Sequence, residues 1–208
     1  MNQLTFQFPF KKNYHSHDFY VSANNFAAYK LIESCPNWPD KWINIYGPSG
    51  CGKTHLAIIL KQKVNSLLIN ASDINDLILT KINNYECLII DNYVNNINEK
   101  LFYSIFNHIK QLDKILLINS LAPLKTLNTK LIDLKSRFDS FIELNIGLPT
   151  DDLLRVIISK SFSEQQIELD IKIMEYIIKN IDRSFEKTFK FVKDIDELSL
   201  STGKSINI

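Results

Sequence analysis

The sequence predicts an α/β fold with a five-stranded parallel sheet covered by helices, followed by a small helical subdomain. Short apolar segments alternate with segments of helical periodicity up to about residue 144, as expected when strands are buried on both faces of a sheet. After Pro149 three helical segments follow one another with no strand between them. A length of 208 residues, 45% of them hydrophobic, suits one such domain with a small appendage.

Each expected element can be placed by residue number. The expected strands are residues 42–46, 67–69, 88–90, 114–118 and 141–144. The expected helices are residues 53–63, 73–82, 98–112, 151–162, 171–180 and 184–198. Right-handed crossovers between the strands would make the sheet doubly wound. In the helical subdomain, Thr150 is the predicted N-cap residue of the first helix, with Asp151 and Asp152 in its first turn.

The expected organisation has three parts: a tail at residues 1–14, a sheet subdomain at 15–148 and a helical lid at 149–208.

Net charge and the distribution of apolar residues exclude some classes of protein. The net charge of +1 argues against a protein that grips duplex DNA along many phosphates. No signal peptide or membrane-spanning apolar run is evident, so we expect a cytoplasmic protein.

The three cysteines have no metal-ligand spacing and fit a reducing compartment. Cys87 lies in an apolar run and is expected in the core. Cys51 lies within the glycine-rich segment described next, where a small filler is a simpler interpretation than a reactive thiol.

A phosphate-binding loop is the strongest signal in the chain. Eight consecutive residues fit G-x-x-x-x-G-K-[ST] between an expected strand and an expected helix: Gly47, Pro48, Ser49, Gly50, Cys51, Gly52, Lys53 and Thr54. Glycines let backbone N–H groups converge on phosphates, and the helix that follows directs its positive end at the same oxygens. A lysine then reaches the β- and γ-phosphates, and a hydroxyl ligates Mg²⁺. The segment therefore predicts binding of ATP or ADP with Mg²⁺, and His55 is a further candidate contact.

Polar residues at the ends of two later strands complete the predicted site. Asp91 follows an apolar strand and is a candidate for holding the Mg²⁺ shell, although an Asp also caps turns. Asn92 follows it and cannot accept a proton as a general base, which predicts weak hydrolysis. Asn119 ends the fourth expected strand and is either a polar sensor of the γ-phosphate or simply a strand terminator. Arg137 precedes the fifth expected strand and is either an arginine finger acting on a neighbouring subunit or a surface charge.

Taken in this order, the motifs resemble those of the DnaA family of AAA+ proteins, and within it the Hda-type regulators. Residues 18–29 resemble the family signature ahead of the phosphate loop, which implies that Phe19 and Val21 line the adenine pocket. Residues 136–138 resemble the family's arginine-finger box, which assigns Arg137 to act in trans. The pair at residues 91–92 is similar to the Hda-type form of the second motif.

Three departures from the DnaA initiators refine the expectation. Only eight residues follow Leu200, where initiators carry a helix-turn-helix domain. The segment between the second strand and Cys87 leaves little room for the helices that initiators use on single-stranded DNA, so we expect little direct DNA binding. In the lid, Glu186 stands near the expected second sensor arginine, which leaves Arg183 or Lys187 as substitutes.

The N-terminal tail contains a short apolar peptide. Gln3, Leu4 and Phe6 resemble the Gln-Leu-x-(Leu/Phe) peptides that dock on the bacterial sliding clamp. The alternative is an edge strand, because Leu4, Phe6, Phe8 and Phe10 alternate with other residues. The Hda resemblance implies a clamp-bound regulator that meets DnaA and promotes hydrolysis of its ATP. The competing hypotheses are an oligomeric ATPase, such as a helicase loader, and a diverged initiator that grips DNA directly.

Overall fold

The computed structural model describes residues 18–95, 97–164, 167 and 169–202, and it divides into two packed units. The first unit, residues 23–147, contains the sheet. The second, which we call the lid unit, comprises residues 18–22 and 148–202. The clamp-like residues Gln3, Leu4 and Phe6 lie outside the described part of the chain.

The predicted α/β fold with a parallel five-stranded sheet is confirmed. The strands are β1 (Trp42–Tyr46), β2 (Ser66–Asn70), β3 (Cys87–Tyr93), β4 (Ile115–Ser120) and β5 (Ile142–Asn145). Their order across the sheet is β2-β3-β4-β1-β5, and all four pairings are parallel. Strand β4 therefore lies between β1 and β3, and their three carboxyl ends meet at one edge, where open α/β sheets bind ligands.

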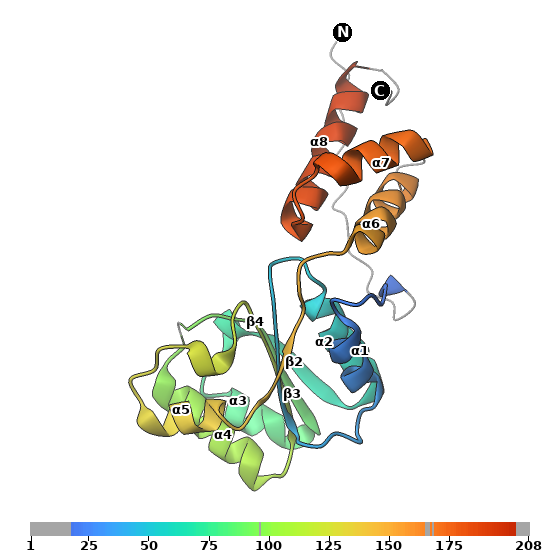
Figure 1. Cartoon of the computed structure of the whole chain (residues 1–208). Coiled ribbons are helices and arrows are strands. Elements are labelled where there is room, and N and C mark those ends of the chain that lie inside the picture. The colour runs from blue at the N-terminus through green and yellow to red at the C-terminus, as the bar shows by residue number, and fades with distance from the viewer. Residues whose placement is uncertain (1–17, 96, 165–166, 168, 203–208) are drawn as a thin grey trace. The chain divides into compact units, whose positions relative to one another are not determined.

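Helices cover both faces of this sheet (Figure 1). Helices α1 (Phe26–Glu33) and α2 (Lys53–Lys63) lie on one face, and α3 (Ile78–Lys81), α4 (Glu99–Gln111) and α5 (Ile132–Phe138) lie on the other. Helices α2 and α4 match the predicted ones to within a residue or two. The helices α1 and α5 were not among the expected elements.

The prediction of one helix over residues 73–82 is wrong. Only α3, a single turn of four residues, is α-helical there, and 3₁₀ turns at Ala71–Asp73 and Ile82–Asn84 flank it. Short polar side chains compete for the backbone: Asn70 accepts a hydrogen bond from the N–H of Ser72, and Asn75 accepts one from the N–H of Leu77. Such local bonds offer the chain an alternative to helix, which explains why the apolar period did not suffice.

An aromatic cluster fills the interior between the sheet and α4 and α5. Phe102, Phe106 and Phe138 are fully buried, and the Phe102 and Phe106 ring centroids lie 4.5 Å apart. Tyr93, at the end of β3, stacks on Phe102 with centroids 4.8 Å apart. This packing holds the strand that carries Asp91 firmly against α4.

The lid unit contains α6 (Asp151–Glu164), α7 (Ile171–Asn180) and α8 (Phe185–Thr202), close to the predicted bounds. Thr150 caps α6 as expected, because its Oγ1 accepts a hydrogen bond from the N–H of Leu153 at 3.3 Å. The core of this unit is one small apolar cluster formed by Leu154, Ile158, Phe162, Ile177, Ile178 and Val192. No helix in the described part of the chain is long and apolar enough to cross a membrane.

Candidate nucleotide-binding site

The phosphate loop connects β1 to α2, and its backbone requires glycine. Gly50 and Gly52 adopt φ angles of 78° and 101°, which side chains rarely tolerate, and Gly52 directly precedes the first residue of α2. A Cβ atom at Gly47 would lie 2.4 Å from the carbonyl oxygen of Ile146. The loop is thus compact, and at these three glycines no Cβ atom stands beside the backbone.

Lys53, the first residue of α2, is held inside the loop. Its Nζ donates to the carbonyl oxygens of Gly47 at 2.7 Å and Pro48 at 2.9 Å. The side chain is buried, with 7% of the residue exposed. A buried ammonium surrounded by carbonyl oxygens is a fixed positive charge, and phosphate oxygens are its natural partners.

Thr54, Asp91 and Asn119 meet at the carboxyl edge of the sheet. Thr54 Oγ1 donates to one carboxylate oxygen of Asp91 at 2.7 Å, and Asn119 Nδ2 donates to the other at 2.9 Å. Asn119 is fully buried, and its Oδ1 has no hydrogen-bond partner among the described residues. The structure therefore brings together Thr54, Asp91 and Asn119, which the sequence predicted as parts of one site, and Lys53 directly precedes Thr54 in the chain.

The donor set at this edge fits a magnesium ion. A hydroxyl and a carboxylate are oxygen ligands of the kind Mg²⁺ prefers, and Mg²⁺ usually takes its remaining ligands from water and substrate phosphates. In the described part of the chain, no three or more His, Cys, Asp or Glu side chains gather into a self-sufficient metal site. Such a sparse set suits an ion that arrives with a nucleotide rather than one bound by protein alone.

Two further residues support the site, and the sequence reasoning missed them. Asn44 lies fully buried in the middle of β1, where its Nδ2 donates to Ile118 O and to Ser120 Oγ, both at 2.9 Å. Its Oδ1 accepts from the N–H of Leu124 at 3.2 Å. The carbonyl oxygen of Ser120 accepts from the N–H of Gly47, which ties the end of β4 to the phosphate loop. An amide side chain inside an otherwise apolar strand was the signal available in the sequence.

Asn92 lies exposed at an irregularity of β3, between Ile90 and Tyr93 in the pairing with β4. Its φ of 56° is left-handed, a conformation that Asn and Asp adopt more readily than other side chains. The backbone conformation at position 92 therefore favours Asn or Asp over other side chains.

Cys51 is a buried thiol within the loop. Desolvation raises its pKa, and the nearby Lys53 ammonium lowers it by a smaller amount. The thiol is therefore protonated near neutral pH, which agrees with its interpretation as a small filler.

Arg137 lies in the last turn of α5, against α4. Its Nη2 donates to Asn107 Oδ1 at 2.9 Å, and its guanidinium carbon lies 5.9 Å from the centroid of the Tyr103 ring. The structure thus places Arg137 with residues of α4, whereas Asp91 pairs with Thr54 of the phosphate loop.

The remaining predicted residues are the candidate contacts to the nucleotide base and the candidate second sensor. His55 is half-buried in the first turn of α2. Phe19 and Val21 are half-buried and belong to the lid unit, so their contact with adenine stays a prediction. In the lid unit Glu186 is exposed, and both proposed substitutes for the sensor arginine are ion-paired: Arg183 with Asp151 at 2.9 Å, and Lys187 with Asp182.

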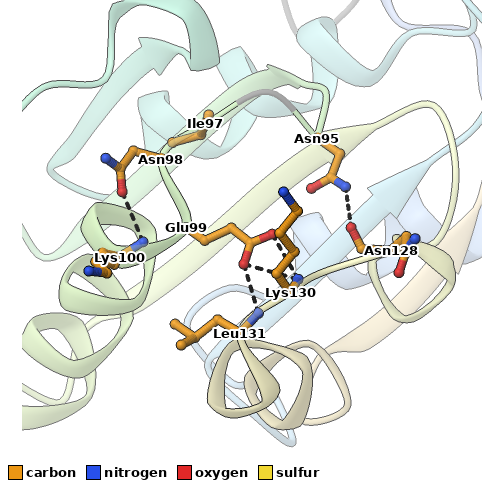
Figure 2. A pocket seen from close by; sticks show the side chains of 8 residues that line it. All are labelled: Asn95, Ile97, Asn98, Glu99, Lys100, Asn128, Lys130 and Leu131. Atoms are coloured by element: carbon orange, nitrogen blue, oxygen red, sulfur yellow. Dashed lines mark hydrogen bonds between the residues drawn. The ribbon is translucent and has the colours of Figure 1, made fainter.

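A separate open pocket of about 740 Å³ lies between the loops that precede α4 and α5 (Figure 2). Across it, the Glu99 carboxylate accepts hydrogen bonds from the backbone N–H groups of Lys130 and Leu131, at 3.0 and 2.8 Å. Asn95 Nδ2 donates to the carbonyl oxygen of Asn128 at 2.5 Å. None of the phosphate-loop residues lines this pocket; its contacts instead join the two loops.

The fold of this chain, a parallel five-stranded sheet covered by helices, is shared with solved structures of DnaA and RuvB. Domain III of the Thermotoga maritima DnaA matches with a TM-score of 0.76 at 18% identity, covering 96% of this chain and 94% of that one. An AMPPCP-bound DnaA from Aquifex aeolicus matches with a TM-score of 0.72 at 23% identity, covering 91% of this chain and 67% of that one. The RuvB Holliday junction branch migration motor of Thermotoga maritima matches with a TM-score of 0.61 at 24% identity, covering 80% of this chain and 58% of that one.

The amino-acid sequence is also similar to those of DnaA proteins. It is 27% identical over 218 residues to the chromosomal replication initiator protein DnaA of Lachnoclostridium phytofermentans, covering 91% of this chain and 48% of that protein. It is 26% identical to the DnaA of Buchnera aphidicola over 238 residues, covering 100% of this chain and 51% of that protein. The chain thus spans about half the length of these relatives. No family model matches it.

Proposed function

We propose that this chain is a nucleotide-binding regulator of replication initiation that docks on the sliding clamp and promotes hydrolysis of DnaA-bound ATP in the cytoplasm. The observation that carries the nucleotide-binding part is the convergence of Lys53, Thr54 and Asp91 at one edge of the sheet. The similarity to DnaA proteins supports the replication part.

The ligand of this site is ATP or ADP with Mg²⁺. Lys53 would pair with phosphate oxygens, and the loop amides would surround them. Thr54 and Asp91 would share the Mg²⁺ coordination, and the ion would neutralise phosphate charge. The unpartnered Oδ1 of Asn119 supports a polar ligand group nearby, such as a water in the shell of the γ-phosphate.

The chain is better equipped to hold nucleotide than to turn it over. The position after Asp91 holds an amide, Asn92, which cannot take a proton from an attacking water. In the lid unit the two cations nearest the expected second sensor are engaged in ion pairs, Arg183 with Asp151 and Lys187 with Asp182. Slow intrinsic hydrolysis is no handicap for a protein whose nucleotide serves as a structural switch.

In this proposal Arg137 acts on the ATP of DnaA rather than on the nucleotide of its own chain. An arginine supplied in trans stabilises the charge that develops on the transferred phosphoryl group. Gln3, Leu4 and Phe6 would dock in the apolar pocket of the clamp and concentrate the regulator where replication begins.

A second candidate is an initiator or a helicase-loading ATPase of related core. The sequence relatives favour it, because those described above are chromosomal replication initiator proteins. In that case Arg137 would act between copies of this chain in a homo-oligomer, and the protein would contact DNA.

The test is binding of the purified chain to the sliding clamp, measured by calorimetry, with the Gln3→Ala/Leu4→Ala variant beside the wild type. We expect micromolar or tighter binding that is lost in the variant. If the wild type does not bind, the clamp-docking proposal is wrong.

A hydrolysis assay with DnaA–ATP and clamp then separates the two candidates. A regulator accelerates release of phosphate from DnaA, and Arg137→Ala abolishes the acceleration. An initiator or loader would instead show steady ATP turnover or oligomerisation on its own.

A further inference from the structure

Helix α5, which carries Arg137, is joined to α4 by polar contacts at both of its ends. At the start of α5, Glu99 accepts hydrogen bonds from the backbone N–H groups of Lys130 and Leu131 (Figure 2). At its end, Arg137 donates to Asn107 and lies over the Tyr103 ring.

The two contacts of Arg137 come from one face of α4. Residues 103 and 107 are four apart in the helix, so their side chains lie one above the other. Together they offer the guanidinium an amide oxygen at its Nη2 and an aromatic surface, the two kinds of neighbour that this group favours. An exposed arginine samples many rotamers, and these two contacts would favour the one that Arg137 adopts here.

Apolar packing also attaches α5 to the protein, apart from these polar contacts. Its Leu134 and Phe138 side chains are fully buried in the aromatic core, which already anchors the helix. Arg137 itself retains an Nε that is buried and has no hydrogen-bond partner, a cost that stability alone does not explain. The arrangement selects an orientation of the guanidinium more than it strengthens the fold.

We propose that Asn107 and Tyr103 are positioning residues for Arg137, which hold its guanidinium in the orientation that reaches a partner's nucleotide. This proposal rests on the trans-acting role proposed above for Arg137. Preorganisation lowers the entropy lost when the arginine meets the transition state, so its loss should slow the chemical step without weakening association.

Helix α4 also offers a matched comparison. Ser104 is exposed beside Tyr103 in the sequence, and its hydroxyl donates to the carbonyl oxygen of Lys100 within the helix. Tyr103→Phe keeps the aromatic ring under the guanidinium, whereas Tyr103→Leu removes it. These variants separate an effect on Arg137 from a general effect on α4.

The functional experiment measures hydrolysis of radiolabelled ATP on DnaA, with clamp and increasing amounts of this chain. We expect Asn107→Ala and Tyr103→Leu to lower the maximal rate roughly tenfold while the half-saturating concentration stays unchanged. Ser104→Ala and Tyr103→Phe should match the wild type. If Arg137→Ala leaves the rate unchanged, the trans-acting role itself fails; if Arg137→Ala abolishes it and Asn107→Ala does not lower it, only the positioning role fails.

A spectroscopic experiment tests the positioning without any partner. The chain has three arginines, Arg137, Arg155 and Arg183, so NMR can resolve their side-chain Nε–H signals and assign each by substitution with lysine. We expect the Arg137 signal to be rigid and slow to exchange in the wild type, and mobile in Asn107→Ala. The Arg155 and Arg183 signals should stay unchanged. A rigid Arg137 signal in Asn107→Ala would overturn the proposal whatever the hydrolysis assay gives.

Discussion

The charged side chains of the predicted nucleotide site are buried, whereas the candidate sensor cations of the lid unit are exposed. Lys53 and Asp91 are almost fully buried, with 7% and 6% of each residue exposed, and both are bonded to groups of the same site. In the lid unit the Arg183 side chain is 62% exposed and the Lys187 side chain 64%, and each pairs with a neighbouring carboxylate.

The difference in burial indicates that the charges at the phosphate loop are fixed in place, whereas the ion pairs of the lid unit can exchange partners. Burial strengthens electrostatic interactions and leaves one arrangement of the loop, so phosphates would meet charges already in place. Exposed ion pairs contribute little, about 0–1 kcal/mol, and exchange readily for other partners. Any contribution of the lid unit to nucleotide binding therefore depends on breaking weak pairs, whereas the loop needs only to exchange carbonyl partners for phosphate.

The largest effect should come from the buried cation of the loop. Lys53→Ala should weaken ADP and ATP binding about a hundredfold, because a charge-assisted bond in a water-poor site is lost. Isothermal calorimetry with each nucleotide measures the change. Lys61→Ala, exposed in the last turn of the same helix, serves as the control and should bind like the wild type. If both variants lose nucleotide affinity, the cause is a general disturbance of α2 and not the loss of the Lys53 ammonium from the loop.

An intermediate effect is expected at the position after Asp91. Asn92→Asp should raise intrinsic ATP turnover about tenfold, because a carboxylate can assist the attacking water. Aspartate tolerates the left-handed φ of 56° at this residue, so the fold should be retained. Steady-state release of phosphate measures the change. Asn84→Asp adds the same charge at an exposed site before β3 and should leave turnover unaltered. Unchanged turnover in Asn92→Asp would mean that another group limits hydrolysis.

The smallest effect is expected in the lid unit. Arg183→Ala should change ATP affinity by less than about threefold and lower stability by less than about 1 kcal/mol, because its pair with Asp151 is exposed. Calorimetry and thermal unfolding measure the two quantities, with Arg155→Ala, which removes another ion-paired arginine of the same unit, as the comparison. A tenfold loss of affinity specific to Arg183→Ala would show that this residue leaves Asp151 to act as the second sensor.

Local sequence signals predicted the phosphate loop and most of the sheet. The loop follows from the identity and spacing of its glycines, Lys53 and Thr54, and the strands follow from short apolar runs that only a doubly covered sheet produces. The prediction for residues 73–82 failed for an equally local reason, since Asn75 accepts a hydrogen bond from the N–H of Leu77, a group that a helix would use. Apolar spacing carries no information about such competing bonds.

Two sets of contacts between distant segments, those of Asn44 and of Arg137, escaped prediction. Asn44 appeared only as a polar interruption of an apolar strand, because its partners are Ile118, Ser120 and Leu124, far along the chain. The Asn107–Arg137 bond likewise depends on how α4 and α5 pack, and α5 itself was not expected.

The amino-acid sequence was sufficient to define an α/β P-loop protein, its order of motifs and the candidates for phosphate and Mg²⁺ binding, because backbone conformation and ligand chemistry depend on residue type and spacing. The strand order, with β4 between β1 and β3, was decided only in three dimensions. That order brings Asn119 and Thr54 onto the two oxygens of Asp91 and places Arg137 against α4, because parallel pairing and core packing join segments that share no local signal.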